Sequence, residues 1–339
     1  MIKLGNIKQS SVGLDIGTNS VKIACLRKNA DKNTLLGYNI KNLPFDIKPD
    51  HVIDVVREAF EEIELSPDEI NLSISGPEVI VRFVDLPKMT KEQLESALVF
   101  EAEKYIPFNI NDVMLDFIIL GDSSEPGQMK VLLAAAKKEA INSRLSMAEN
   151  LGMAVNLLDI NSFAMFNAFL ASNQEDLDGK GIAFFDLGYS DTNVIISTGK
   201  VPSFMRLIQI GTKDIISAMS RNLSIPIDQV DALMMGKDEA SNNSIREGAG
   251  SILDDLVNEM QLSFGYFENR SNIAVKEVFC SGGMVHQQVA LDYLSQKLEV
   301  TLKKWNPLEG LILSESLSGE DLEKAASQLA VAVGLALRD

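Results

Sequence analysis

The chain has 339 residues, 46% hydrophobic and 23% charged, which is enough apolar material to bury a core in about two domains. This composition excludes a disordered or low-complexity protein. The formal net charge of −17 disfavours nucleic acid and anionic lipid surfaces as general partners. With only two cysteines, no apolar leader at its start and no apolar run long enough to span a membrane, the chain is predicted to be cytoplasmic and not inserted in a membrane.

Strands and helices alternate along the first 170 residues. Alternating apolar residues over 11–26 predict a strand, a tight glycine-containing turn and a second strand. The other elements expected here are strands at 33–42, 69–75, 79–86, 112–120, 128–135 and 154–159, and helices at 51–63, 90–105, 137–151 and from 161. This order predicts a mixed α/β fold.

The polar stretch 171–181 is predicted to join two halves of the chain. The elements expected after it are strands at 182–186, 193–198 and 203–209, helices, a loop at 236–250, a long helix from 251, a strand at 278–280 and a terminal Leu/Ala-rich helix. The opening pattern therefore recurs in the second half.

An internal repeat supports this division. The segment VGLDIGTNSVKIA aligns with AFFDLGYSDTNVI, which places Asp15 over Asp186 and Gly17 over Gly188. Each copy is an apolar strand, an aspartate, a glycine turn and a second apolar strand. The repeat predicts two related halves that face one cleft.

Both turns lead into a strand, whereas the glycine turns of Rossmann folds and P-loops open a helix. A turn of small residues can still present backbone N–H groups to an anion. Two carboxylates beside a polyphosphate would need a divalent cation between them, and Mg²⁺ suits that role. Lys22 has the parity to point to the same side as Asp15. Taken singly, each turn also fits an ordinary hairpin.

A third motif, Ser281-Gly282-Gly283, follows an apolar strand. Adjacent glycines let a flat ligand ring rest on the backbone, although a plain strand-to-helix turn has the same sequence. In this order the three motifs resemble the phosphate-1, phosphate-2 and adenosine motifs of the actin-like ATPase superfamily.

The chain is most similar to type IV pilus assembly proteins of the PilM family, relatives of FtsA. The segments that carry this resemblance are LSISGPEVIVRFVDLPKM (72–89), LESALVFEAEKYIPFN (94–109), VLLAAAKKEAIN (131–142), LGMAVNLLDINSFAM (151–165) and the terminal AVAVGLALR (330–338). It covers essentially the full length. It implies a two-lobed actin-like (duplicated ribonuclease H-like) fold, with a first lobe at 1–180, an inserted α/β subdomain at about 86–150 and a second lobe at 181–339.

The resemblance implies that ATP or ADP binds with Mg²⁺ in the cleft, with Asp15 and Asp186 holding the metal through water. The residues it places at the nucleotide are Gly17, Thr18, Asn19, Lys22, Gly188, Tyr189, Thr192, Gly211, Asp231, Met234, Gly282 and Gly283. Two of them depart from the family pattern, because Tyr189 stands where many relatives have a small residue and Met234 where relatives often have a lysine. Asn161 stands where the family usually has an acid. Asparagine can orient a water but cannot take its proton, so at most weak ATPase activity is expected.

The resemblance also implies a partner: the N-terminal cytoplasmic peptide of a PilN-like inner-membrane protein, bound beside the subdomain. Other pilus assembly components and a position at the inner membrane through the partner are implied with it. The candidate groove residues are Leu86, Pro87, Tyr105 and Pro107.

Two alternative functions are compatible with the same fold. A small-molecule kinase of the same fold would need an acid to deprotonate a substrate hydroxyl, and none is evident. An FtsA-like polymerising ATPase would end in a basic amphipathic helix, whereas AVAVGLALRD is typical of a buried one.

Overall fold

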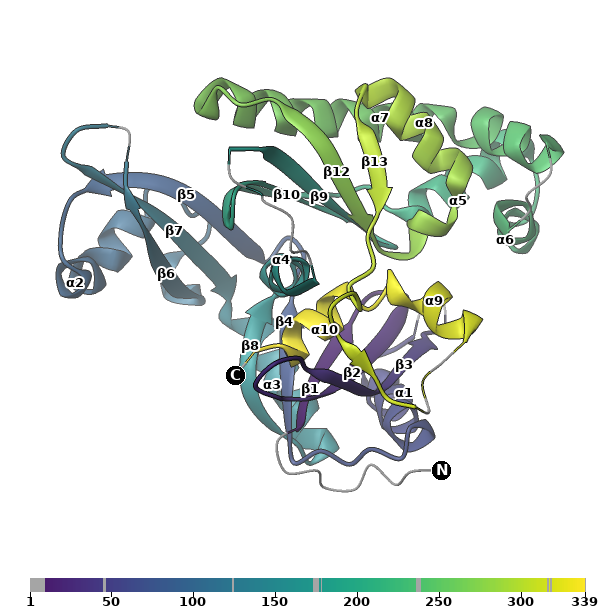
Figure 1. The fold of residues 1–339 in the computed structure, drawn as a ribbon, viewed down its shortest axis with the longest axis horizontal. Coiled ribbons are helices and arrows are strands. Elements are labelled where there is room, and N and C mark those ends of the chain that lie inside the picture. The colour runs from purple at the N-terminus through teal and green to yellow at the C-terminus, as the bar shows by residue number, and fades with distance from the viewer. Residues whose placement is uncertain are drawn as a thin grey trace.

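The computed structural model describes residues 10–338 except 45–46, 124, 173–176, 178, 236–238, 316 and 318. Figure 1 shows its sheets and helices, and the largest sheet has six strands in the order β14-β3-β2-β1-β4-β8. Its strands are β1 (Ser10–Ile16), β2 (Ser20–Arg27), β3 (Thr34–Asn42), β4 (Glu69–Ile74), β8 (Ala154–Ile160) and β14 (Ile312–Leu313).

A second sheet has five strands in the order β11-β10-β9-β12-β13. Its strands are β9 (Gly181–Leu187), β10 (Thr192–Thr198), β11 (Val201–Ile208), β12 (Val275–Ser281) and β13 (Thr301–Lys304). Strands β9, β10 and β11 pair antiparallel, and β12 runs parallel to both β9 and β13. The strands β1, β2, β3, β4 and β8 repeat this order and these directions. The duplication predicted from the two aspartate–glycine turns is therefore present in the sheets.

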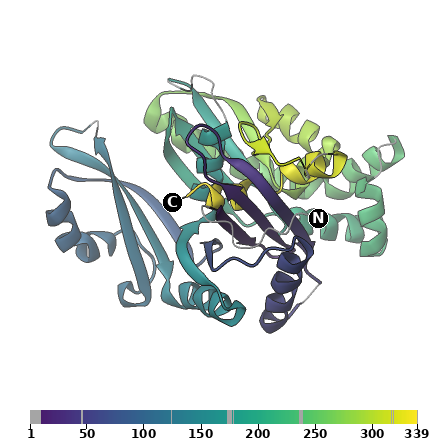
Figure 2. The same cartoon turned by 60° about the horizontal axis from the view of Figure 1, so that its bottom comes forward.

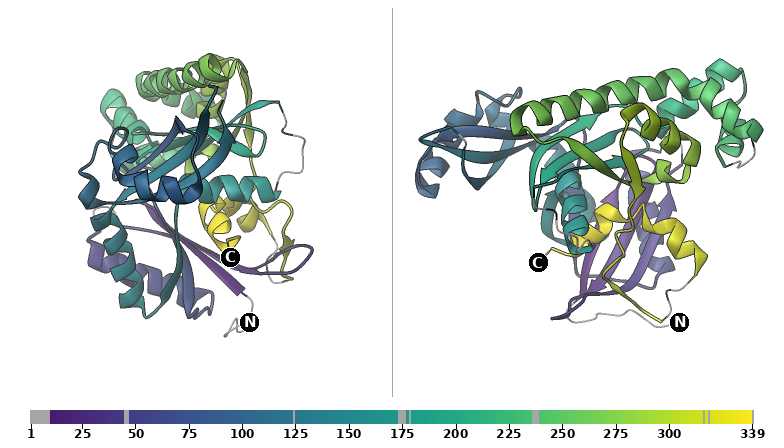
Figure 3. Two further views of the ribbon diagram at one scale, coloured as in Figure 1. Left: turned by 90° about the vertical axis from the view of Figure 1, so that its left-hand side faces the viewer. Right: turned by 45° about the horizontal axis from the view of Figure 1, so that its top comes forward.

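Helices cover both sheets and fill the space between them (Figures 1 and 3). Helices α1 and α3 cover the outer face of the six-stranded sheet, α4 and α10 lie between the sheets, and α5, α7 and α8 cover the outer face of the five-stranded sheet. The helices are α1 (Pro49–Glu62), α2 (Lys91–Ala102), α3 (Lys138–Leu151), α4 (Asn161–Ser172), α5 (Thr212–Leu223), α6 (Ile227–Met235), α7 (Glu239–Ser271), α8 (Gln288–Leu298), α9 (Glu320–Ala326) and α10 (Ala330–Ala336).

Strand alternation sorts the side chains between these layers. Along β2, Val21 and Ile23 join the core under α1 and α3, whereas Ala24 and Leu26 join the core between the sheets. That middle core also contains Trp305, whose indole Nε1 donates a hydrogen bond to Ser172 Oγ at 2.8 Å. The middle layer therefore binds the two sheets into one body.

The end of the chain returns to the six-stranded sheet. Strand β14 pairs with β3, and α10 packs against β1, β2 and α4. This contact is close because glycines stand at the crossing. A Cβ at Gly13 would lie 2.0 Å from the Ala332 carbonyl oxygen, and one at Gly334 would lie 1.8 Å from that of Ala164. The last residues, expected in the second lobe, thus pack on the sheet of the first.

A small third sheet projects from this body (Figure 2). Its strands, in the order β5-β7-β6, are β5 (Val79–Pro87), β6 (Val113–Asp122) and β7 (Gln128–Lys137). Helix α2 packs on one face and begins with a capping box formed by Thr90 and Gln93. The sheet and α2 span residues 79–137, whereas the sequence led us to expect an inserted subdomain at about 86–150.

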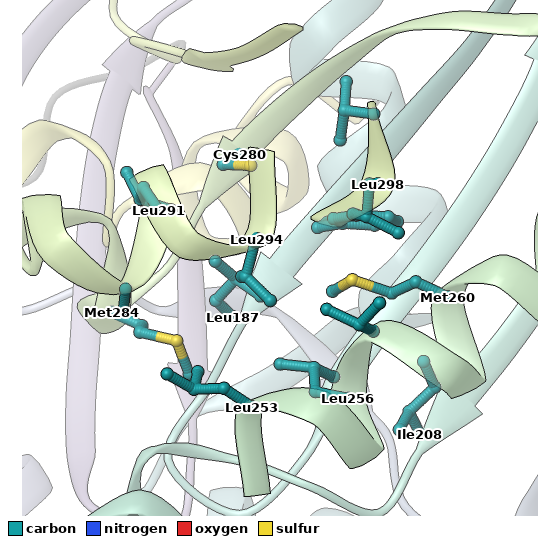
Figure 4. Close-up of a cluster of buried hydrophobic side chains, with 14 of the residues drawn as sticks. Leu187, Ile208, Leu253, Leu256, Met260, Cys280, Met284, Leu291, Leu294 and Leu298 are labelled. Atoms are coloured by element: carbon teal, nitrogen blue, oxygen red, sulfur yellow. The ribbon is translucent and has the colours of Figure 1, made fainter. Parts of the chain in front are cut away.

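The loop predicted over 236–250 is wrong for residues 239–250, which form the first turns of α7. Buried Ile245 and Ala249 begin a helical stripe that continues through α7, where Figure 4 shows Leu253, Leu256 and Met260 facing the sheet and α8. A Cβ at Gly248 would lie 2.9 Å from Met219 Cγ. The glycine thus allows α7 to pack closely on α5.

Candidate functional site

The first candidate carboxylate, Asp15, points toward the middle layer because Leu14 and Ile16 point to the other face of β1. Strand pairing places Lys22 directly opposite Asp15 on β2. The Lys22 Nζ lies 3.0 Å from Asp15 Oδ2, and both side chains are largely buried. The lysine expected to face the same side as Asp15 thus forms an ion pair with it.

The second carboxylate, Asp186, occupies the same place on β9. Its neighbours Phe185 and Leu187 point into the outer core, so Asp186 also faces the middle of the molecule. Ser281 Oγ donates a hydrogen bond to Asp186 Oδ1 at 3.2 Å. Burial raises the pKa of Asp186 to about 6, opposed by the positive charge of Lys22 and increased by the negative charge of Asp15. A cation beside the two carboxylates would remove this electrostatic penalty.

The turns that follow the two aspartates have the same geometry. Gly17 N donates to the Ser20 carbonyl at 3.0 Å, and Gly188 N donates to that of Asp191 at 3.0 Å. A Cβ at Gly188 would lie 2.7 Å from the Asp191 carbonyl oxygen, so this turn can close only around a glycine.

The two turns also touch each other. Ser190 Oγ donates a hydrogen bond to Thr18 Oγ1 at 2.8 Å, although the two residues are 172 positions apart in the chain. The hydroxyl groups are exposed, so the bond is accessible to solvent and to ligands. The turns of the two sheets therefore form opposite sides of one opening.

Gly282 closes the third side of the opening. Its φ of +92° is unfavourable for other residues, and a Cβ there would lie 2.5 Å from the Leu187 carbonyl oxygen and 2.9 Å from Asp186 Oδ1. Its N–H donates to the Ser327 carbonyl at 2.8 Å. The backbone around Gly282 thus lies directly against the strand that carries Asp186.

These elements enclose a cavity of about 1000 Å³ between the six-stranded and five-stranded sheets. The predicted site residues that line it are Asp15, Gly17, Thr18, Asn19, Lys22, Asn161, Asp186, Gly188, Tyr189, Gly282 and Gly283. Its size is that of a pocket for a nucleotide-sized ligand. One cavity thus brings together residues from four separate parts of the sequence.

Three predicted nucleotide residues with described side chains do not line this cavity. Thr192 is fully buried, and its Oγ1 donates to the Ile210 carbonyl at 2.8 Å. Gly211 precedes α5, where its N–H donates to Asp214 Oδ2 at 2.9 Å. Met234 belongs to the core under the five-stranded sheet, because its face of α6 packs inward. Asp231 lies in α6, and its side chain is outside the described part of the chain.

Residues 13–339 match the family described as type IV pilus assembly protein PilM. The chain belongs to this family. It is also similar to a chain of a "PilM-PilN type IV pilus biogenesis complex", with 25% identity, a TM-score of 0.86, and coverage of 97% of this chain and 98% of that one.

Two more distant structures share the fold. The ethanolamine utilization protein EutJ from Carboxydothermus hydrogenoformans is 11% identical with a TM-score of 0.58, covering 98% of this chain and 90% of that one. A Bacteroides thetaiotaomicron protein with an actin-like ATPase fold is 10% identical with a TM-score of 0.51, covering 100% of both chains. The PilM-family chain therefore has the actin-like fold expected from its sequence.

Sequence reasoning missed several polar residues of the cavity. Arg144 on α3 lines it and donates from Nη2 to the Ile16 carbonyl at 3.1 Å. Asp191, in the turn between β9 and β10, and Lys213, in the first turn of α5, line it from the other side. Burial raises the pKa of Asp191, opposed by Lys213 and increased by Asp15. The repeat could have identified Asp191 as a cavity residue, because Asp191 lies in the turn that aligns with the first one. Arg144 lies in a helix that carries no motif, so no signal in the sequence pointed to it.

The candidate groove residues fall into two groups. Leu86 is 1% exposed in the core between α2 and the three-stranded sheet, so a peptide cannot reach it without rearrangement. Its inward position on β5 follows from strand alternation. Tyr105 is half-buried against the same core, whereas Pro87 and Pro107 are exposed. Pro107 borders a hollow of about 550 Å³ that reaches the start of α3.

Among the described residues, no three His, Cys, Asp or Glu side chains are grouped to bind a metal ion by themselves. A cation at Asp15 and Asp186 would therefore need further oxygen ligands from water or a bound ligand.

In the described part of the chain no helix combines the length and apolar character needed to cross a membrane.

Proposed function

We propose that this PilM-family chain is a nucleotide-binding scaffold of type IV pilus assembly. Its cavity would hold ATP or ADP with Mg²⁺, and a separate surface would bind the N-terminal cytoplasmic peptide of a PilN-like inner-membrane protein. The observation that carries the nucleotide proposal is the pair of matched Asp-x-Gly turns, one from each sheet, that line one cavity. The partner would place the chain at the cytoplasmic face of the inner membrane.

The residues present fit a magnesium nucleotide. Asp15 and Asp186 face the same cavity, and Asp186 there carries an electrostatic penalty that a divalent cation would relieve. Bound Mg²⁺ would neutralise phosphate charge between the two carboxylates. The N–H groups in the turns after β1 and β9 would contact phosphate oxygens. The backbone at Gly282 and Gly283 would pack on the adenosine.

Asn161 supports a role in binding rather than rapid turnover. It lines the cavity at the start of α4, and its amide can orient a water molecule without accepting a proton. A missing general base typically costs about 10²–10⁴ in rate. The nucleotide would therefore remain bound long enough to hold the two sheets in one relative orientation. That orientation can control partner binding only if the nucleotide has different affinities for the alternatives.

Support for the partner comes from the similar chain in the PilM-PilN complex, which aligns with 97% of the present chain. The aligned region includes the three-stranded sheet as well as the rest of the fold, as expected if both chains bind a partner at the same surface. The subdomain is attached to the body by β5 and β7, which lead directly to elements lining the cavity. Peptide binding and nucleotide binding are therefore expected to influence each other.

Calorimetric titration with the N-terminal peptide of the PilN-like partner tests both parts. The peptide should bind, and its affinity should differ between protein with and without Mg-ATP, while a scrambled peptide should not bind. Absence of peptide binding in both conditions would overturn the partner role. Equal affinities in both would overturn nucleotide control, and no heat with Mg-ATP alone would overturn the nucleotide site.

A further inference from the structure

Arg144 is the part of the cavity that the aspartate–glycine motifs do not explain. It lies on α3, is half-buried, and reaches the end of β1, where Nη2 donates to the Ile16 carbonyl at 3.1 Å. A guanidinium has five N–H donors in a planar fork. Within the described residues this is its one hydrogen bond, and it forms no ion pair there. Most of its donor capacity is therefore available beside the first turn.

Acidic side chains outnumber basic ones around the cavity, so an anionic ligand would need a cationic group there. The charged residues that line it are acidic Asp15, Glu78, Asp186, Asp191 and Asp214, and basic Lys22, Arg144 and Lys213. Lys22 is already engaged by Asp15. Burial lowers the pKa of Arg144, and the nearby negative charge of Asp15 opposes that shift. An arginine nevertheless stays charged in proteins, so an anion would compensate its burial directly.

The position of Arg144 also connects the cavity to the three-stranded sheet. Strand β7 is the central strand of that sheet and ends at Lys137, and α3 begins at Lys138 without an intervening loop. Arg144 lies about two helical turns further along α3. A ligand that binds the Arg144 guanidinium would therefore act on a helix that is continuous with the three-stranded sheet.

We propose that Arg144 binds the phosphate groups of the nucleotide and couples their presence, through α3 and β7, to the three-stranded sheet. The inference rests on the proposed nucleotide site and adds to it a phosphate contact outside the three sequence motifs. Arginine suits this task because its fork can hold two phosphate oxygens at once. An alternative role, support of the Ile16 carbonyl alone, would affect stability without affecting ligand binding.

The test compares wild type with Arg144→Gln and Arg144→Lys in titrations with Mg-ATP. Loss of a charged hydrogen-bond donor should weaken binding about tenfold or more in the glutamine variant, with a smaller loss in the lysine variant. Arg246→Gln, on an exposed part of α7, is the charge-matched control and should bind as wild type does. Melting temperatures measured without ligand identify any loss due to unfolding.

Amide hydrogen exchange at saturating Mg-ATP tests the coupling. Nucleotide should slow exchange in β7 and α3 of wild type and much less in the glutamine variant. Unchanged ATP affinity in both Arg144 variants, or a lowered melting temperature with unchanged affinity, would overturn the phosphate contact. Equal protection of β7 in wild type and variant would overturn the coupling. If wild type itself binds no nucleotide, the proposed function fails together with this inference.

Discussion

Replacing Asp186 by asparagine should stabilise the free protein at pH 7.5 and abolish its magnesium-dependent nucleotide binding. Burial holds the pKa of Asp186 at about 6 instead of the ordinary 3.8. The folded protein therefore binds this proton more tightly than the unfolded chain does. As pH rises from about 4 to 6, the free energy of unfolding falls because the buried carboxyl must ionise.

The expected gain follows from the size of this pKa shift. A tenfold change in the acid constant corresponds to about 1.4 kcal/mol, so the full cost at pH 7.5 is about 3 kcal/mol. This is an upper limit because Asp186 still borders the cavity and its water. An asparagine carries no charge and can keep the hydrogen bond from Ser281. At pH 5 the gain should be about half as large.

Urea unfolding at pH 7.5 and pH 5 measures this effect, and Trp305 is a suitable probe as the single tryptophan, buried in the middle layer. Asp255→Asn, on an exposed part of α7, is the matched control and should change stability by less than about 0.5 kcal/mol at both pH values. Mg-ATP should raise the unfolding midpoint of wild type and of the control but not of Asp186→Asn. A destabilised variant at pH 7.5, or an equal gain at both pH values, would refute the electrostatic reasoning.

Three further substitutions test other parts of the site. Gly282→Ala should destabilise the fold by about 1–3 kcal/mol or more, because it combines positive φ with a carbonyl contact, whereas Gly283→Ala has open space and should be neutral in thermal melts. Ser190→Ala removes the hydrogen bond to Thr18 that closes the opening, so nucleotide should associate faster in stopped-flow measurements; an unchanged rate would show that the bond is no barrier. Asn161→Asp should raise ATP hydrolysis about tenfold or more in a phosphate-release assay if a missing base limits turnover, and an unchanged rate would contradict that reasoning.

The sequence predicted well those features that depend on residues close to one another in the chain. The alternation around Asp15 and Lys22 fixes which way both side chains point, and the structure pairs them. The repeat of that pattern at Asp186 predicted the matching turn, because the same local pairing forms it again. The residue pattern also predicted the three strands of the small sheet, whereas their grouping as an insert came from the family resemblance.

The features that were missed depend on packing between distant elements. The loop predicted over 236–250 includes Gly248, but packing on α5 makes this glycine a contact point within α7. Met234 stands where relatives often have a lysine near the nucleoside, and the orientation of α6 turns it into the core. Arg144 reaches the cavity only because α3 packs across the end of β1, and nothing in its neighbourhood of the sequence indicates this.

The packing of α10 on β1 affects how the protein can fold during synthesis. Residues 10–27 form the central hairpin of the six-stranded sheet, but the helix that covers its inner face comes from residues 330–336. While the ribosome still holds the C-terminal segment, this hairpin must expose apolar side chains such as Ala24 and Leu26. The six-stranded sheet can therefore reach its final packing only after residues 330–336 have left the ribosome, and until then its exposed apolar side chains can be bound by chaperones.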